Sequence, residues 1–280
     1  MPGTSKRISN GSPPVPGPPV TALRRGRAVL TSEWIKMGSL RSLRATALTG
    51  LVFSVLLAFL VCTGFHSRWH SLGPETRAAF RPVDTSLGFL QLTPLLFGAL
   101  GALVVTGEYG TGQIRGTFAA TPQRPLVLAA KAVLLGAVGL ALALITVGFA
   151  FLVGQGQLAG TAPHASLGSS GAAGALLGGA LYLTLTALFG LFLGVVVRST
   201  AVAVSTLFGL FLVLPVLVDN LPKGAAWRHT VPWLPSNLGY SLWHSPAPLL
   251  VRATPAGFAL AGWVVLLAAG ALASLRVRDA

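Results

Sequence analysis

The acidic side chains of this 280-residue chain are few enough to be considered one by one. Every one of them falls at or beyond the end of an apolar segment: Glu33, Glu75, Asp84, Glu108, Asp219 and Asp279. A carrier that is driven by a proton or sodium gradient generally needs an ionisable group near the middle of the membrane. The pattern therefore argues against ion-coupled transport and indicates that the energy for any transport comes from elsewhere.

The sequence also lacks motifs for nucleotide binding, metal binding or covalent catalysis. The Gly-rich stretches GTGQIRG and GQGQLAG contain no lysine where the phosphate-binding loop GxxxxGK[ST] requires one. Neither HExxH nor GxSxG occurs, and no Cys or His residues are paired at metal-ligand spacing. We therefore expect no catalytic residue, cofactor site or metal site on this chain, and an intramembrane enzyme has no visible nucleophile or metal set.

Apolar segments long enough to cross a bilayer recur along the chain. Hydrophobic residues make up 53% of it and charged residues 9%, and a helix needs roughly 20 apolar residues to cross a bilayer core. The sequence predicts an all-α membrane protein with six transmembrane helices, at 46–66, 86–106, 129–153, 172–197, 200–218 and 256–275. Gln91, Thr93 and Pro94 interrupt the second helix, which is therefore kinked or begins later. Cys62 is the single cysteine of the chain and lies within the first predicted helix. It is expected to pack there as a small hydrophobic residue.

The distribution of basic residues predicts how these helices are oriented. With six crossings, 14 of the 20 Lys and Arg residues fall on the side of the two termini and six on the other side. Positive residues accumulate on the cytoplasmic side, so both the N- and C-termini are expected to be cytoplasmic in a multi-pass protein of the plasma or inner membrane. The net charge of +14 thus reflects membrane topology and contact with lipids, and we expect no nucleic-acid partner.

Two segments precede the first predicted span. Residues 1–21 are rich in Pro, Gly and Ser, which predicts a disordered cytoplasmic tail, and no cleaved signal is expected because the first apolar run reaches full spanning length. Residues 22–45 predict an amphipathic interfacial helix with basic side chains at the anionic head groups of the inner leaflet. The alternative is that this helix only anchors and orients the first span.

Three further features carry alternative interpretations. The connection 107–128 contains a possible short helix at 112–120, which is either a coupling element that docks on a cytoplasmic protein or an ordinary solvated loop. The outer connection 219–255 is rich in aromatic residues and Pro, which indicates short helices that dip into the outer leaflet or cap an exit, or only an aromatic belt. The pairs Gly174/Gly178 and Gly190/Gly194 predict close helix packing, either in a dimer face or simply because Gly is common here.

The order of three motifs resembles that of ABC-2 type permeases of ATP-binding cassette transporters. The motifs are Ser-Glu-Trp-x-Lys at 32–36, Gly-Glu-Tyr-x-x-Gly-x-Ile-Arg at 107–115, and Thr-Pro-x-Arg at 121–124 before Lys131. The resemblance covers residues 22–278, and the six-span plan and the absence of a nucleotide-binding motif agree with it. It implies that residues 46–278 form an ABC-2 type transmembrane domain.

The resemblance also implies partners and sites. Two permease copies, identical or different, would work with two copies of a separately encoded ATP-binding subunit, usually as an exporter, and ATP would be bound by that partner. The residues that would couple to the ATPase by motif are Glu33, Lys36, Glu108, Tyr109, Arg115 and Arg124.

The translocation path would run between the two copies. We expect it to be lined by Thr184, Thr186, Ser205 and Thr206, which favours hydrophobic or amphipathic cargo, unless these hydroxyls bond their own helix backbone. The alternative to a permease is a membrane scaffold or sensor that binds a cytoplasmic partner without transporting anything.

Overall fold

The computed structural model describes residues 22–39, 41–114, 116, 123–220, 230–244 and 251–277, and within these ranges it contains helices and their connections but no strand. The all-α class is therefore confirmed. The tail 1–21, predicted to be disordered, lies outside the described residues. The long helices are α1 (Ala22–Ser39), α2 (Arg41–Arg68), α5 (Thr93–Gly110), α7 (Arg124–Leu158), α8 (Ala172–Val197), α9 (Thr200–Phe208) and α12 (Ala253–Val277). The short elements are η1 (Trp69–Ser71), α3 (Pro74–Ala78), α4 (Pro82–Ser86), η2 (Gly88–Gln91), η3 (Gly209–Val213), α10 (Leu214–Asp219), η5 (Val231–Trp233) and α11 (Pro235–Trp243).

Five of these stretches are long and apolar enough to cross a membrane, among the residues that the structure describes. They are Arg41–Ser71, Arg124–Leu158, Ala172–Val197, Thr200–Val218 and Ala253–Val277. The chain therefore has the character of a multi-pass membrane protein. The predicted second span is not among the five, because Pro82, Gly88 and Pro94 divide that region into α4, η2 and the shorter, 18-residue α5.

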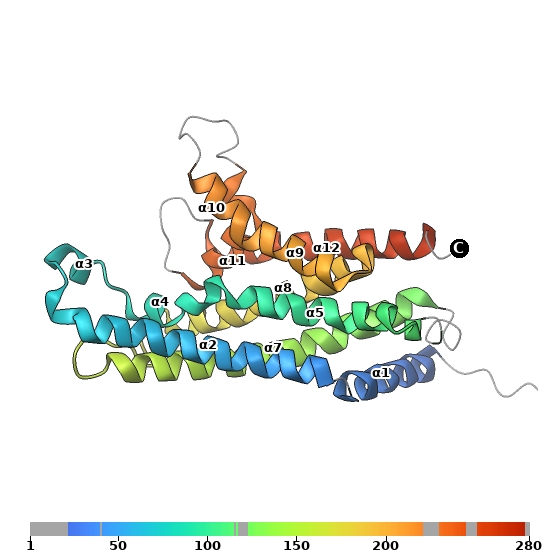
Figure 1. Ribbon diagram of the computed structural model, residues 1–280, viewed down its shortest axis with the longest axis horizontal. Coiled ribbons are helices and arrows are strands. Elements are labelled where there is room, and N and C mark those ends of the chain that lie inside the picture. The colour runs from blue at the N-terminus through green and yellow to red at the C-terminus, as the bar shows by residue number, and fades with distance from the viewer. Residues whose placement is uncertain are drawn as a thin grey trace, which may run out of the picture.

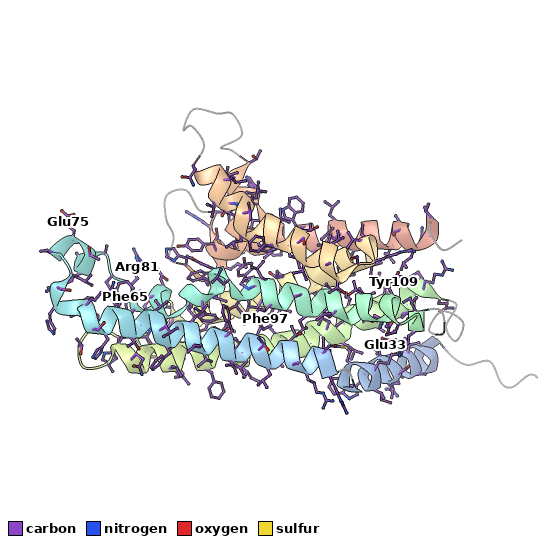
Figure 2. The ribbon with its side chains drawn as sticks, viewed as in Figure 1. Glu33, Phe65, Glu75, Arg81, Phe97 and Tyr109 are labelled. Atoms are coloured by element: carbon purple, nitrogen blue, oxygen red, sulfur yellow. The ribbon has the colours of Figure 1, made fainter. Side chains whose placement is uncertain are left out.

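The helices α2, α5, α7, α8 and α12 run roughly side by side, whereas α9 continues toward α10 at an angle to them (Figure 1). The helix α1 and the end of α12 lie at one end of this bundle, and α3 and α11 lie at the other (Figure 1). In the same orientation, Glu33 and Tyr109 are at the end that carries α1, and Phe65 and Glu75 are at the opposite end (Figure 2). Helix α1 and the end of α12 thus lie at the same end of the bundle; the number of crossings and the end that faces the cytoplasm stay predictions.

The helix α8 is the centre of the bundle. In its apolar 18-residue stretch 72% of the residues are buried inside the chain, against 17–28% in the corresponding stretches of the other four candidate spans. It packs lengthwise on α5 through small residues: a Cβ on Gly190 would overlap the carbonyl oxygen of Gly98, and one on Gly101 would overlap that of Ala187. Without a solvent to drive apolar surfaces together, membrane helices associate by such close backbone contact.

The predicted glycine pairs are thus used within the chain. Gly194 lies against Val105 on α5, and Gly178 lies against the backbone of Leu242 on α11, whereas a Cβ on Gly174 would meet nothing within 4 Å. Close packing is confirmed for three of the four positions. It serves the contacts of α8 with α5 and α11.

The first predicted boundary is shifted in the structure. Helix α1 ends at Ser39 and α2 begins at Arg41, so the first span starts five residues before its predicted position of 46. The stripe of α1 that faces the bundle consists of Val29, Glu33 and Met37, all of them buried. Trp34 of the same helix is 57% exposed.

The opposite end is built from the connections. Gln155 of α7 is buried; its amide nitrogen donates to the carbonyl of Pro82 (2.8 Å) and to Ser86 Oγ (2.9 Å), and its oxygen accepts from the N–H of Ala165. One side chain therefore ties α4 and the α7–α8 connection together. Cys62 is fully buried nearby, which confirms its packing role.

Candidate functional site

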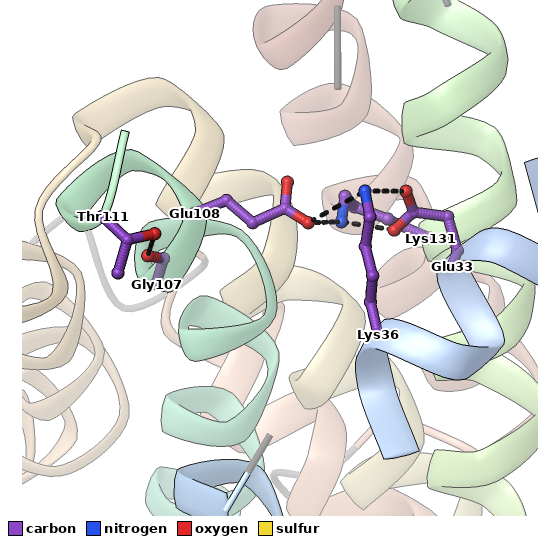
Figure 3. A network of polar contacts seen from close by, with 6 residues as sticks. All are labelled: Glu33, Lys36, Gly107, Glu108, Thr111 and Lys131. Carbon is purple, nitrogen blue, oxygen red and sulfur yellow. Dashed lines mark hydrogen bonds and ion pairs between the residues drawn. The ribbon is translucent and has the colours of Figure 1, made fainter. Parts of the chain in front are cut away.

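Three helices bring four charged side chains together at the end of the bundle that carries α1. Glu33 and Lys36 come from α1, Glu108 from the last turn of α5, and Lys131 from α7 (Figure 3). Figure 3 shows Glu33 and Glu108 pointing toward each other from opposite sides, with the two lysine ammonium groups between them. We call these four residues the charge cluster.

Lys131 is the hub of the charge cluster. Its Nζ lies 2.5 Å from Glu33 Oε2 and 2.7 Å from Glu108 Oε1. Lys36 Nζ lies 2.9 Å from Glu33 Oε1 and 3.6 Å from Glu108 Oε1. Each ammonium thus lies between two carboxylates, and the formal charge of the four groups sums to zero.

The charge cluster is largely withdrawn from solvent. Glu33 is 2% exposed, Lys131 3% and Glu108 5%, while the side chain of Lys36 is 34% exposed. Burying an isolated charge costs several kcal/mol, and a buried pair is tolerated because the partners replace the lost water. The three buried groups therefore depend on one another, and removing any one leaves an uncompensated charge inside the protein.

Lys36 closes the open side of the charge cluster. Burial lowers the pKa of this ammonium, but the hydrogen bond to Glu33 and the nearby charges of Glu108 and Glu33 outweigh that effect and raise the pKa above its ordinary value of 10.5. Lys36 is thus charged throughout the physiological range. It provides the second positive charge that the two carboxylates need.

The end of α5 explains why Glu108 requires cations. A carboxylate in the last turn of a helix meets the negative end of the helix dipole, and Thr111 closes that turn by donating from its Oγ1 to the carbonyl of Gly107 at 2.9 Å (Figure 3). The Glu108 Oε2 atom is buried and has no hydrogen-bond partner among the described residues. Lys131 and Lys36 offset the resulting negative potential.

A second contact, next to the charge cluster, joins the end of α5 to the α8–α9 junction. The guanidinium of Arg198 lies over the ring of Tyr109, 5.2 Å from its centroid, in the geometry of a cation–π contact. Arg198 ends α8 with a φ of 56°, a left-handed conformation that is strained for a residue with a Cβ. Thr106 and Thr200 share a hydrogen bond of 2.7 Å beside it.

The start of α7 is also fastened to the last helix. Arg124 is half-buried, and its Nη1 donates to the backbone carbonyl of Leu275 at 2.9 Å. That carbonyl is near the end of α12, where helix carbonyls lack an intrahelical donor. The ends of α5, α7, α8 and α12 at this side of the bundle are therefore all held by charged or polar side chains.

The six residues predicted to couple to an ATPase occupy different positions. The structure brings Glu33, Lys36 and Glu108 into one cluster, places Tyr109 under Arg198, and uses Arg124 to hold α12, while Arg115 lies outside the described residues. Glu108 and Tyr109 belong to helix α5, and Arg124 begins α7, so the connection is shorter than the predicted 107–128. Since Glu33 and Glu108 are buried, direct contact with a partner falls to exposed neighbours; the coupling role stays a prediction.

Sequence reasoning missed Lys131 and Arg198 as site residues. Lys131 lies inside an apolar segment, and an ammonium in such a position is itself a signal for a buried partner. Nothing local marks Arg198, because its left-handed conformation follows from the sharp turn between α8 and α9. Both residues were recognised only through their neighbours in space.

The four predicted path residues do not share one surface. Thr184 and Thr186 are buried in α8 and donate to the backbone carbonyls of Ala180 and Tyr182. Thr206 is exposed on α9 and donates to the carbonyl of Val202, and Ser205 is exposed beside it. The alternative, bonding to the same helix, thus holds for the three threonines. Only Ser205 and Thr206 are available to a second copy.

The described part of the connection 219–255 lies at the end of the bundle opposite to the charge cluster. It contains two short helices in its described part, η5 and α11, and Trp243 is buried inside the protein instead of facing a membrane interface. A cavity of about 380 Å³ lies between α11 and the α4 region, lined by Phe65, Thr76, Ala79, Phe80, Arg81, Asp84, Thr85, Gly88, Gln91, Tyr240, Trp243 and His244. Trp227 and the prolines at 222, 246 and 248 lie outside the described residues.

The His244 side chain is a titratable group with a perturbed pKa at this end of the bundle. Its Nδ1 lies 3.4 Å from Asp84 Oδ2, and its ring stacks on Tyr240 at 4.4 Å between centroids. Burial lowers the pKa of His244 from its ordinary value and outweighs the opposing charge of Asp84; the charge of Arg81 lowers it further. Neutral His244 is thus favoured by its surroundings.

Comparison with known proteins gives no family for this chain. No protein-family model matches it, and no curated protein matches it. Among the described residues, no three His, Cys, Asp or Glu side chains are grouped so that they could hold a metal ion.

Proposed function

We propose that this chain is the membrane-spanning permease subunit of an ATP-driven exporter, with six crossings and both termini in the cytoplasm. A separately encoded ATP-binding subunit would supply the energy, and a second permease copy would complete the path for a hydrophobic or amphipathic cargo. The cytoplasmic end would be the end with the charge cluster. The proposal rests on the motif resemblance to ABC-2 type permeases together with the position of those motifs in the fold.

The observation that carries the proposal is the buried junction between motif residues that are distant in sequence. Glu33 of the first motif, Glu108 of the second and Lys131, which follows the third, meet within hydrogen-bonding distance. Through them the segment before the first span, the end of α5 and the start of α7 form one unit. A partner that moves this unit would move three helices together, because the paired charges cannot be separated without a large desolvation cost.

A cross-linking experiment tests the proposal on the surface of this unit. Gln113 is exposed just beyond α5, and Leu167 is exposed at the opposite end of the bundle. In a Cys62→Ala background, Gln113→Cys should cross-link to a co-expressed ATP-binding subunit, and Leu167→Cys should not. A pull-down of the native complex with mass spectrometry identifies that subunit first.

Transport activity is tested with the purified complex reconstituted in vesicles. We expect ATP hydrolysis to be stimulated by the permease and efflux of a lipophilic dye to require ATP. A partner that binds at Gln113→Cys without ATP-dependent efflux would favour the scaffold or sensor instead. Efflux driven by an ion gradient with the permease alone would contradict the proposal.

A further inference from the structure

A groove between α1 and α2 is the most distinct unassigned feature at the end with the charge cluster. It has a volume of about 250 Å³ and is lined by Trp34, Met37, Gly38, Leu43, Arg44, Ala47, Leu100, Leu135, Val138, Gly139 and Leu142. Ten of these eleven residues are apolar or glycine, and the exception is a cation. We call this feature the α1–α2 groove.

Two glycines keep the α1–α2 groove open. Gly38 is on α1 and Gly139 is on α7, and a Cβ added to either would meet no atom within 4 Å. Gly139 is itself buried from solvent, and the space where its Cβ would lie is open. An apolar channel of this kind suits a flexible hydrocarbon chain, which gains dispersion contacts with the walls.

The mouth of the groove is positively charged. Arg44 lines it, and Arg41 is one turn earlier on the same helix, so the two guanidinium groups share a face. Both are exposed. They belong to the first turn of α2, which contains no acidic residue, and the positive end of a helix dipole also favours an anion.

The carboxylates at this end do not oppose an anion. Glu33 and Glu108 are buried and neutralised within the charge cluster, so they present little negative charge to the groove. Trp34, which lines the groove, and its neighbour Ile35 are exposed apolar side chains, and exposed Trp is typical of residues at a membrane interface. The surroundings therefore combine an apolar slot, a cationic mouth and an interfacial rim.

We propose that the α1–α2 groove binds one acyl chain of an anionic phospholipid, with the lipid phosphate at Arg44 and Arg41. The occupant would fill the space that the two glycines leave open and would hold α1 against the bundle. This inference depends on insertion in a membrane but not on transport.

Native mass spectrometry of the purified full chain tests the proposal. Phosphatidylglycerol and phosphatidylcholine with identical acyl chains are added in turn, and the retained lipid is counted. Arg44→Gln should weaken retention of phosphatidylglycerol about tenfold, as expected when one charge-assisted contact is lost, and should leave phosphatidylcholine unchanged. Gly139→Leu, which fills the groove, should abolish retention of the tightly held lipid.

Two matched controls separate the groove from bulk lipid. Gly136→Leu alters the same helix outside the groove, and Arg276→Gln removes an exposed cation of α12; neither should change retention. A phosphatidylglycerol with a photoreactive acyl chain should label peptides that contain Trp34 or Leu43. Equal retention of both lipids, or labelling that survives Gly139→Leu, would overturn the proposal.

Discussion

Lys131 Nζ lies 2.5 Å from Glu33 Oε2, although the two residues are 98 positions apart in the chain. The contact joins α7 to a helix that precedes the first candidate span. Both side chains are almost fully buried, so the contact is made where water cannot compensate either charge. Together with the buried apolar side chains of Val29 and Met37, it packs α1 against the bundle.

Removing the hub should destabilise the fold strongly. Lys131→Met leaves the carboxylates of Glu33 and Glu108 buried near each other with only Lys36 to offset them, and breaking a buried pair in this way costs about 3–5 kcal/mol. Thermal unfolding in detergent, followed by tryptophan fluorescence, measures the loss. Lys36→Met is the matched control and should cost less, since Lys36 is partly exposed; equal losses would contradict the assignment of Lys131 as hub.

Neutralising Glu33 should release α1 from the bundle. Beyond the charge cluster, only two apolar side chains in the described part of this helix are buried: Val29, which packs against Val127 and Ala130, and Met37. Glu33→Ala is therefore expected to increase trypsin cleavage after Arg27 in the detergent-solubilised protein. Thr31→Ala, an exposed change on the same helix, should not; an unchanged cleavage rate in Glu33→Ala would show that other contacts hold α1.

The contact of α5 with α8 should not accept a methyl group. A Cβ on Gly190 would overlap the backbone of Gly98, and overpacking of a tight interface typically costs about 1–3 kcal/mol. Gly190→Ala should lower the melting temperature accordingly. Gly136→Ala provides the comparison, because a Cβ there meets nothing within 4 Å, and a similar loss in both variants would indicate that the interface is looser than described.

The junction after α8 should prefer glycine. Arg198 adopts a φ of 56°, which costs a residue with a Cβ roughly 1–2 kcal/mol relative to glycine. Arg198→Gly and Arg198→Ala both remove the contact with Tyr109, so their difference reports the backbone alone. We expect the glycine variant to be the more stable by about 1 kcal/mol in chemical unfolding; an equally stable alanine variant would exclude strain at this residue.

Acidification should weaken the outer end through His244. Its folded-state pKa is held below the ordinary value of 6.5 by burial, so as the pH falls through 6.5 the unfolded chain takes up a proton before the folded chain does. The free energy of unfolding therefore decreases as the pH falls from 6.5 to the lower pKa that His244 has in the folded protein. The melting temperature of the wild type should fall more than that of His244→Gln over this range, and parallel pH profiles would contradict the prediction.

The membrane character and most of the helix positions could be predicted from the sequence. The predicted span 172–197 coincides with α8, and the ranges 46–66, 129–153 and 256–275 each lie inside a longer helix. Such predictions succeed because an apolar run of sufficient length has few alternatives in a bilayer, where the backbone must bond within its own helix. The region 86–106 was the exception, since Pro and Gly divide it.

The candidate site could be predicted only in part. Glu33, Lys36 and Glu108 were recognised as important, but as a surface for a partner, and the structure places them in a buried cluster. The Gly190/Gly194 pair was recognised as a packing motif without its partner helix. In each case the residue could be recognised from the sequence, but its contact partner could not. The partner depends on which helices pack side by side.

Local sequence thus determined the elements of this protein: the length of each apolar run and the breaks at Pro and Gly. Tertiary structure alone decided that Lys131 meets Glu33 and Glu108, that Arg198 lies over Tyr109, and that α8 is central. The physical reason is that these interactions act over different distances along the chain. Hydrophobicity and backbone bonding act over a few neighbouring residues, whereas a buried charge selects whichever opposite charge the packing of distant helices brings within reach.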